Sequence, residues 1–176
     1  MRHPLIRHTH FRFCPKCGRR GIAAIDKKSM RCKAWAYVYF HNCSAAVAGI
    51  VQTPKGIILT VRNADPKKGR LDLPGGFVDY NESLEDALAR EIKEELNIGI
   101  SMVNYLGSFP NVYRYKNVTY FTVDTIFTCK AKRLSSLRPN SEIAGVRFAK
   151  PRDIDFSGIG FPSTRSALMR YAAAYL

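Results

Sequence analysis

The stretch from Gly76 to Ile98 constrains the fold of this 176-residue chain more than any other feature. Its apolar residues recur at a spacing of four, which predicts one buried face on a helix over about residues 84–96. These apolar residues are Leu88, Ile92 and Leu96. Ser83 is a favourable N-cap residue, and acidic residues follow it in the first turn. The sequence therefore predicts an amphipathic helix that packs on a core and is entered through a glycine-containing loop.

Three glutamates share another face of this predicted helix. At about 100° per residue, Glu91, Glu94 and Glu95 fall within an arc of roughly 100°. Carboxylates that crowd together repel one another unless a cation lies between them, and hard oxygen ligands favour Mg²⁺ or Mn²⁺. Arg90 can pair with Glu94 at the i,i+4 spacing and orient it. The pattern therefore predicts a divalent-metal site on the helix.

The same stretch resembles the signature of the Nudix hydrolase family. That signature has a glycine, a glutamate six residues later, and then Arg-Glu-aliphatic-X-Glu-Glu-X-Gly-aliphatic. The matching residues are Gly76, Glu82, Arg90, Glu91, Ile92, Glu94, Glu95 and Ile98. Asn97 departs from the pattern where the family has glycine, but asparagine is the next-best residue for a left-handed helix C-cap. Asn81 is a softer departure, since many members carry glycine before the glutamate.

The resemblance implies both a fold and a reaction. The implied fold is α/β of the α+β type, a Nudix α/β/α sandwich with a mixed sheet. The implied reaction is magnesium-dependent cleavage of a pyrophosphate bond. The expected metal-binding groups are the carboxylates of Glu91, Glu94 and Glu95 with the carbonyl of Gly76. Glu82 is expected to support the metal or the attacking water.

The resemblance leaves the general base and the substrate contacts open. Candidates for the base are Glu94, Glu95 and Glu142, the last of which stands in a loop before a predicted strand. Phe109 and Tyr113 are candidates for stacking on a nucleobase, against the alternative that they are ordinary strand residues. The basic loop 67–70 is either a second phosphate contact or a solvated loop.

Short apolar runs between turn signals predict strands outside the helix. They cover about residues 45–51, 56–62, 105–115, 118–128 and 144–148, and Pro162 introduces a closing helix through Tyr171. Leu73-Pro74-Gly75-Gly76 is expected to be a break. The predicted organisation is a segment over residues 1–43 followed by a catalytic domain over residues 44–176.

The N-terminal segment contains four of the five cysteines. Cys14 and Cys17 form a knuckle with Gly18, and Cys32 follows at zinc-ribbon spacing. A ribbon would place its fourth ligand near position 35, which is Trp35. Either zinc is completed by Cys43, His41 or His10, or the site has lost its metal and aromatic packing around Trp35 replaces it. A ribbon ahead of a Nudix domain resembles the NADH pyrophosphatase branch, but that branch's aromatic-proline segment survives only in fragments at 107–113.

The net charge of +14 favours polyanionic partners. The expected partner is a nucleotide-derived small molecule of the ADP-ribose, NADH or nucleotide-sugar type. The alternative is a nucleotide-sensing or RNA-binding protein without turnover, and removal of nucleotide caps from RNA would join the two. No apolar stretch reaches membrane-spanning length, so a cytoplasmic protein without membrane contact is expected. A homodimer is compatible with the family.

Overall fold

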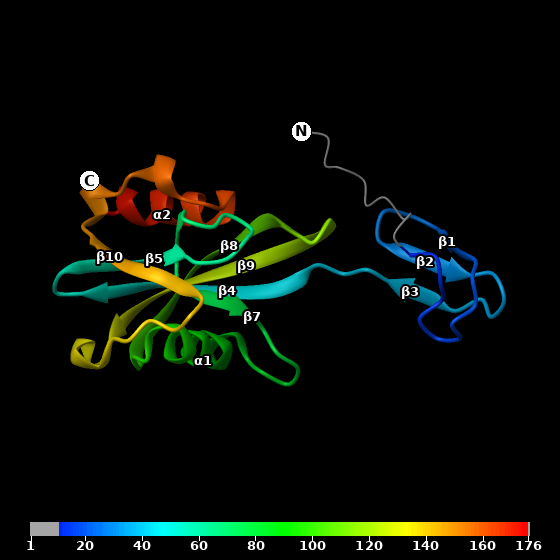
Figure 1. Cartoon of the computed structure of the whole chain (residues 1–176), viewed down its shortest axis with the longest axis horizontal. Helices are drawn as coiled ribbons and strands as arrows, with labels where there is room; N and C mark the ends of the chain where they lie inside the picture. Colours follow the sequence, from blue (N-terminus) through cyan, green and yellow to red (C-terminus); the bar gives the residue numbers. More distant parts are fainter. Residues whose placement is uncertain (1–10, 176) are drawn as a thin grey trace. The chain divides into compact units, whose positions relative to one another are not determined.

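The computed structural model describes residues 11–175 and divides the chain into two compact units, Met1–Cys43 and Ser44–Leu176 (Figure 1). The N-terminal unit contains a small antiparallel sheet in the order β1-β2-β3. Its strands are β1 (Ile22–Ala24), β2 (Ser29–Cys32) and β3 (Val38–Phe40). His10, one of the candidate zinc ligands, lies outside the described residues.

A seven-stranded mixed sheet forms the centre of the second unit. Its strands are β4 (Ser44–Thr53), β5 (Gly56–Arg62), β6 (Leu71–Asp72), β7 (Gly75–Phe77), β8 (Ile100–Tyr115), β9 (Val118–Ala131) and β10 (Ile143–Ala149). The main order is β10-β5-β4-β9-β8, with β6 paired to β5 and β7 paired to β4. Strands β4 and β9 run parallel, and the other pairs are antiparallel. Short 3-10 turns lie at Leu134–Ser136, Pro151–Asp153 and Phe156–Gly158.

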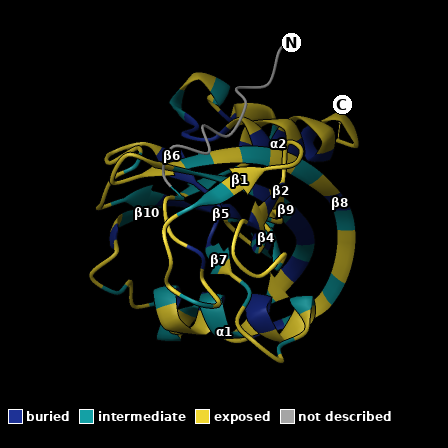
Figure 2. Ribbon diagram, turned by 90° about the vertical axis from the view of Figure 1, so that its right-hand side faces the viewer, coloured by how far each residue is buried: buried dark blue, intermediate teal, exposed yellow. Residues whose placement is uncertain are grey.

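Helices α1 (Leu84–Leu96) and α2 (Pro162–Ala173) cover opposite faces of this sheet (Figure 1). One core cluster joins α1 to the sheet through Leu88, Ile92 and Leu96. A second cluster joins α2 to the other face through Ala167 and Leu168. The buried side of each helix is visible in Figure 2. These two cores confirm the expected α/β/α sandwich with a mixed sheet.

Helix α1 has the predicted bounds and caps. The Ser83 hydroxyl accepts a hydrogen bond from the Asp86 amide at 3.1 Å. At the other end, Asn97 has φ 57° and ψ 29°, and its amide donates to the Lys93 carbonyl at 2.9 Å. Asparagine therefore supplies the left-handed cap that the signature usually takes from glycine.

The sheet differs from the expectation in two places. Strand β8 begins at Ile100 and β9 continues to Ala131, so both are longer than their apolar runs indicate. The expected break at the two glycines is instead the strand β7, with Gly75 opposite Ala48 and Gly76 opposite Val47. A β-carbon on Gly75 would overlap the Val47 carbonyl oxygen, so this pairing requires glycine.

Among residues 11–175, no helix is long and apolar enough to cross a membrane.

Candidate active site

A cavity of about 390 Å³ lies in the second unit and brings together residues from α1, the sheet and α2. Its acidic lining comprises Asp72, Asp79, Glu91, Glu94, Glu95, Asp124 and Glu142, and its aromatic lining comprises Phe77, Tyr113 and Phe161. Arg62 is the single arginine or lysine that lines it among the described residues. The cavity therefore combines many carboxylates with one cation and aromatic rings.

The α1 glutamates occupy the cavity in different environments. Glu91 and Glu95 are half-buried, whereas the Glu94 side chain is 57% exposed. The Gly75 amide donates to Oε2 of Glu95 at 3.0 Å. Burial, with the nearby negative charge of Glu91 and other carboxylates, raises the pKa of Glu95 to about 8 despite that hydrogen bond.

Gly76 lies directly against the carboxylate of Glu91. A β-carbon at Gly76 would stand 2.5 Å from Oε1 of Glu91, so the absence of a side chain leaves room for this carboxylate. Burial raises the pKa of Glu91, and Glu94 and Glu142 raise it further, while Arg90 acts in the opposite direction. The structure thus brings together the carboxylates and the glycine that the sequence analysis selected as metal ligands.

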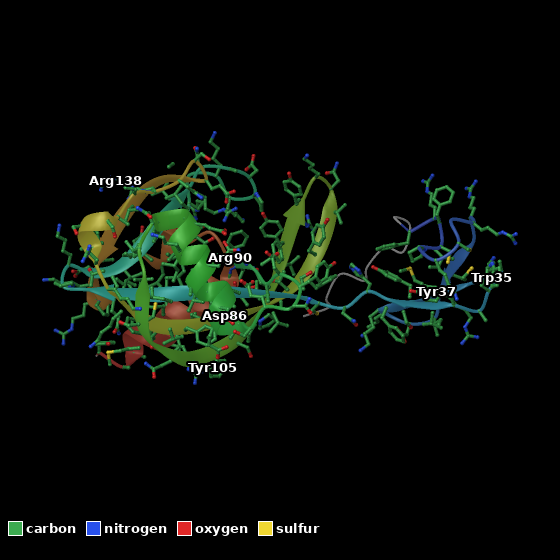
Figure 3. The ribbon with its side chains drawn as sticks, turned by 90° about the horizontal axis from the view of Figure 1, so that it is seen from below. Trp35, Tyr37, Asp86, Arg90, Tyr105 and Arg138 are labelled. Carbon is green, nitrogen blue, oxygen red and sulfur yellow. The ribbon has the colours of Figure 1, made fainter. Side chains whose placement is uncertain are left out.

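Arg90 ties the loop before α1 to the helix. Its Nε and one terminal nitrogen donate to the two carboxylate oxygens of Glu82, at 2.8 and 2.9 Å. The guanidinium also donates to the Phe77 carbonyl at 3.0 Å, to Glu91 at 2.9 Å and to Glu94 at 3.3 Å. Arg90 is labelled on α1 in Figure 3. Neither Arg90 nor Glu82 lines the cavity, so their contacts indicate a positioning role for the loop and the glutamates.

The donor set of the α1 site fits a hard divalent cation. Burial and neighbouring carboxylates raise the pKa values of Glu91 and Glu95, and a positive charge between such groups would stabilise their charged forms. Among the described residues, however, only the thiols of the N-terminal unit form a group of three or more ligand side chains with donor atoms within 4.8 Å of one another. Binding of a cation would therefore have to draw the glutamate side chains closer together.

The raised pKa of Glu95 gives a prediction for the metal-free protein. The pKa of this carboxyl is about 8 in the folded protein and near 4.5 in the unfolded chain. Its contribution to the stability of the fold is therefore fully present below pH 4.5 and is lost as the pH rises to about 8. In EDTA, we expect Glu95→Gln to raise the melting temperature at pH 8 by about 5 °C or more and to have little effect at pH 5. Thermal unfolding across this range measures the difference, and an equal difference at both pH values would contradict it.

A group of aromatic residues also lines the cavity. The rings of Tyr113 and Phe161 are stacked, with centroids 5.9 Å apart, and Phe77 meets Tyr113 edge-on at 5.8 Å. Phe109 does not line the cavity and packs against the α2 core. Of the two stacking candidates, the structure therefore places only Tyr113 at the cavity.

A polar cluster beside these rings was missed by the sequence analysis. Asp124 accepts hydrogen bonds from Asn111 Nδ2 at 2.9 Å, Thr122 Oγ1 at 2.6 Å and Ser163 Oγ at 2.6 Å. These residues come from β8, β9 and α2, which are distant in the sequence. The alternation of side chains along β9 hinted that Thr122 and Asp124 share a face, but nothing local indicated that this face borders a cavity.

A second missed group lies where β5, β6 and α2 meet. The buried carboxylate of Asp72 accepts from Thr164 Oγ1 at 2.8 Å and lies 3.3 Å from an Arg62 terminal nitrogen. Burial raises the pKa of Asp72, although Thr164 and Arg62 both favour its charged form. The Arg62 guanidinium also lies over the Phe161 ring, 5.2 Å from its centroid. Arg62 is thus held in place by a carboxylate and an aromatic face.

The predicted cysteine knuckle is present in the N-terminal unit. The ligand atoms of Cys14, Cys17 and Cys32 lie within 4.8 Å of one another. Cys43 is exposed and stands outside this group, and His41 packs against Phe11 with ring centroids 5.3 Å apart. The Trp35 side chain is exposed, so the expected alternative of Trp35 packing in place of a metal is wrong.

Cys129 is buried on β9, and burial raises the pKa of its thiol to about 12.

Comparisons with known proteins identify the domain that contains this cavity. The NUDIX domain model matches residues 44–168. The chain is 29% identical to the NAD-capped RNA hydrolase NudC of Vibrio atlanticus over 113 residues. This matched region covers 64% of this chain and 42% of that protein. Over 72 residues, it is 40% identical to the ADP-ribose pyrophosphatase of Methanocaldococcus jannaschii, covering 41% of this chain and 42% of that protein. The chain thus spans less than half the length of these two curated relatives.

A solved structure shows similarity over more of the chain. The crystal structure of a NUDIX hydrolase from Nitrosomonas europaea covers 93% of this chain and 91% of its own, with a TM-score of 0.73 and 25% identity. The NUDIX domain of Shewanella oneidensis NrtR, solved with ADP ribose, has the same fold at a TM-score of 0.62 and 18% identity. From the match of the NUDIX domain model to residues 44–168, we conclude that this chain belongs to the NUDIX domain family.

Proposed function

We propose that this chain is a Mg²⁺- or Mn²⁺-dependent hydrolase that cleaves the pyrophosphate bond of a nucleoside diphosphate linked to a second group. The observation that carries the proposal is that the α1 carboxylates, Arg62 and a stacked aromatic pair line one cavity. A diphosphate with a nucleoside at one end could contact a cation held by the carboxylates, the arginine and the aromatic rings there. Two curated relatives are named as hydrolases of an NAD cap and of ADP-ribose, which supports the same substrate class.

The residues that would hold the divalent ion are Glu91, Glu94 and Glu95, together with the Gly76 carbonyl. When bound, the ion supplies Lewis-acid stabilisation of the charge on the diphosphate. Glu82 and Arg90 keep the loop in place through their two-pronged ion pair, so the glutamates and Gly76 face the same part of the cavity. Without a cation, these negative carboxylates would repel the phosphate oxygens of the substrate. A divalent ion between the carboxylates and the phosphates removes this repulsion.

Arg62 and the aromatic rings would bind the rest of the substrate. Arg62 carries the positive charge in the described cavity lining, so we assign to it a phosphate oxygen that the metal does not hold. Tyr113 and Phe161 offer flat apolar faces for a nucleobase, and the Asp124 cluster offers polar groups beside them. The cavity volume of about 390 Å³ is in the range of small-molecule sites.

Among the three candidates, Glu142 is our assignment for the general base. Its side chain lines the cavity and makes no hydrogen bond or ion pair with any residue between 11 and 175. Glu94 is instead paired with Arg90, and Glu95 accepts from the Gly75 amide. Glu142 is therefore the carboxylate that is most available to take a proton from the attacking water.

Replacing Glu142 with glutamine should lower kcat by about 10²–10³, because the amide cannot accept the proton. Steady-state kinetics across pH measure the effect, and the rising limb of the pH–rate profile should disappear. Glu85→Gln, which removes an exposed acid on α1 outside the cavity, is the matched control. An unchanged pH profile in Glu142→Gln would move the role to Glu94 or Glu95.

A substrate panel tests the proposed function. It contains ADP-ribose, NADH, NAD⁺, diadenosine polyphosphates, nucleotide sugars and NAD-capped RNA, with mononucleotide release measured with and without Mg²⁺. Turnover of one class that is lost in Glu94→Gln and Glu95→Gln would support the hydrolase and identify its substrate. Silence across the panel from a folded protein that binds Mg²⁺ would favour nucleotide sensing or RNA binding, for which the charge of +14 is suited.

We also propose that the three clustered thiols hold zinc, and that the protein acts in the cytoplasm.

A further inference from the structure

The N-terminal unit has almost no hydrophobic core. Among residues 11–43, the buried side chains are those of Cys14, Ser29, Met30 and Cys32. None of the aromatic residues in this range is buried, and three of them are exposed: Phe13 by 60%, Trp35 by 61% and Phe40 by 55%. A unit of this size needs a stabiliser other than apolar burial, such as a disulfide or a metal. All three clustered cysteines are free thiols, which leaves the metal.

The spacing of the thiols fits zinc. The sulfur atoms of Cys17 and Cys32 lie 3.8 Å apart, far beyond a disulfide bond. Tetrahedral zinc with Zn–S bonds of about 2.3 Å places its sulfur ligands about 3.8 Å from each other. The distance between these two thiols therefore equals one edge of a zinc tetrahedron.

Two matching turns surround these thiols, and their alignment identifies where a fourth ligand would stand. In the first turn, the Gly18 amide donates to the Cys14 carbonyl at 2.8 Å, and Gly18 has φ 67°. In the second, the Ala36 amide donates to the Cys32 carbonyl at 3.1 Å, and Ala36 has φ 53°. An alanine in this left-handed conformation is strained, so the second turn keeps the shape of a metal knuckle.

The next hydrogen bond in each turn agrees with this alignment. The Cys14 amide donates to the Arg19 carbonyl at 2.9 Å, and the Cys32 amide donates to the Tyr37 carbonyl at 2.8 Å. Cys14 thus corresponds to Cys32, and Cys17 corresponds to Trp35. The residue at the position of the fourth ligand is Trp35, whose indole cannot ligate zinc (Figure 3). Its side chain is exposed and so does not occupy the fourth coordination position.

We propose that the N-terminal unit binds one zinc ion through Cys14, Cys17 and Cys32 as its ligands among residues 11–43, with a fourth coordination position that is open at Trp35 and takes an external ligand, water or a small thiol. This inference rests on the zinc proposed above for these thiols and is independent of the hydrolase activity. Such a site differs from a closed structural site, in which four protein ligands exclude exchange. The open corner makes the zinc extractable and reactive toward external thiols.

Cobalt substitution in the full-length protein tests the open position. Added small thiol should change the visible d–d spectrum of the Co²⁺-loaded wild type, because the thiol replaces water at the fourth corner. Trp35→Cys should show the four-thiolate spectrum from the start and should not respond to added thiol. Trp35→Ser is the matched control, since it removes the indole without supplying a sulfur ligand at the corner, and it should respond to thiol as the wild type does.

Zinc extraction by a chelator gives a second measurement. Trp35→Cys should lose zinc at least about tenfold more slowly than the wild type or Trp35→Ser, since even outer-shell partners change zinc affinity by this factor. Cys43→Ser and His10→Ala should leave the spectrum and the extraction rate unchanged. Three results would each overturn the proposal: no metal in the purified protein, a wild-type spectrum that ignores thiol, or a change caused by either of these two substitutions. Hydrolase turnover is recorded separately, so its loss would not be mistaken for failure at the thiols.

Discussion

Glu95→Gln is expected to lower kcat by roughly 10³-fold while leaving the fold intact, since a metal ligand supplies several kcal/mol of transition-state stabilisation and each 1.36 kcal/mol is tenfold in rate. Glutamine has the same shape, and its amide oxygen can still accept the hydrogen bond that the Gly75 amide gives to Glu95 at 3.0 Å. What the substitution removes is the negative charge in a half-buried position beside Glu91.

Steady-state kinetics at saturating substrate and a Mg²⁺ titration measure this prediction. The apparent Mg²⁺ affinity should fall together with kcat, because the same carboxylate binds the ion. Glu85→Gln is the control, as it removes one acidic charge from the exposed first turn of the same helix. Wild-type activity in Glu95→Gln would show that the cavity does not use this carboxylate.

The second large effect separates two neighbouring glycines. A β-carbon on Gly75 would overlap the backbone of Val47 and Ala48, and Gly75 has φ 149°. Because the partner strand cannot move aside, Gly75→Ala should destabilise the protein by about 2–4 kcal/mol through strain and overpacking. A β-carbon on Gly76 would instead meet the carboxylate of Glu91, at the end of a flexible side chain. Gly76→Ala should therefore fold normally but displace Glu91 and lose most of its activity.

Urea unfolding and kinetics on both variants test this contrast. The expected pattern is a lower unfolding midpoint for Gly75→Ala, and a near-wild-type midpoint with strongly reduced kcat and Mg²⁺ affinity for Gly76→Ala. Equal losses of stability in the two variants would mean that Gly76 is required for strand pairing and not for the position of Glu91.

The parts of the fold that depend on local sequence were predictable. Helix α1 has its predicted bounds because the apolar spacing, the Ser83 cap and the Asn97 cap all act within a few residues. Strand β7 was not predicted, because two glycines normally indicate a turn and the strand forms only through close approach to β4. A contact between distant segments leaves no local pattern in the chain.

The residues of the candidate site also fall into a group that the local sequence predicts and a group that it does not. The glutamates and Arg90 share one helix, so their spacing alone placed them together. Arg62 on β5, Asp124 on β9 and Phe161 just before α2 are distant in the sequence and meet only in the folded domain. Tyr113 and Phe109 lie four residues apart on β8, yet only Tyr113 reaches the cavity. The residues of the proposed metal site could therefore be predicted from the sequence, whereas the proposed substrate contacts depend on the packing of α2 and β8 around the cavity.

Hydrolysis in ¹⁸O-labelled water shows whether the enzyme cleaves a pyrophosphate bond by attack of water at phosphorus. With Mg²⁺ present and the substrate that the panel identifies, we predict equal amounts of a mononucleotide and a second phosphate monoester. One of the two should carry a single ¹⁸O on phosphorus, because water attacks one side of the pyrophosphate bond. Label on a sugar carbon, label in neither phosphate, or cleavage that continues unchanged in EDTA would contradict it.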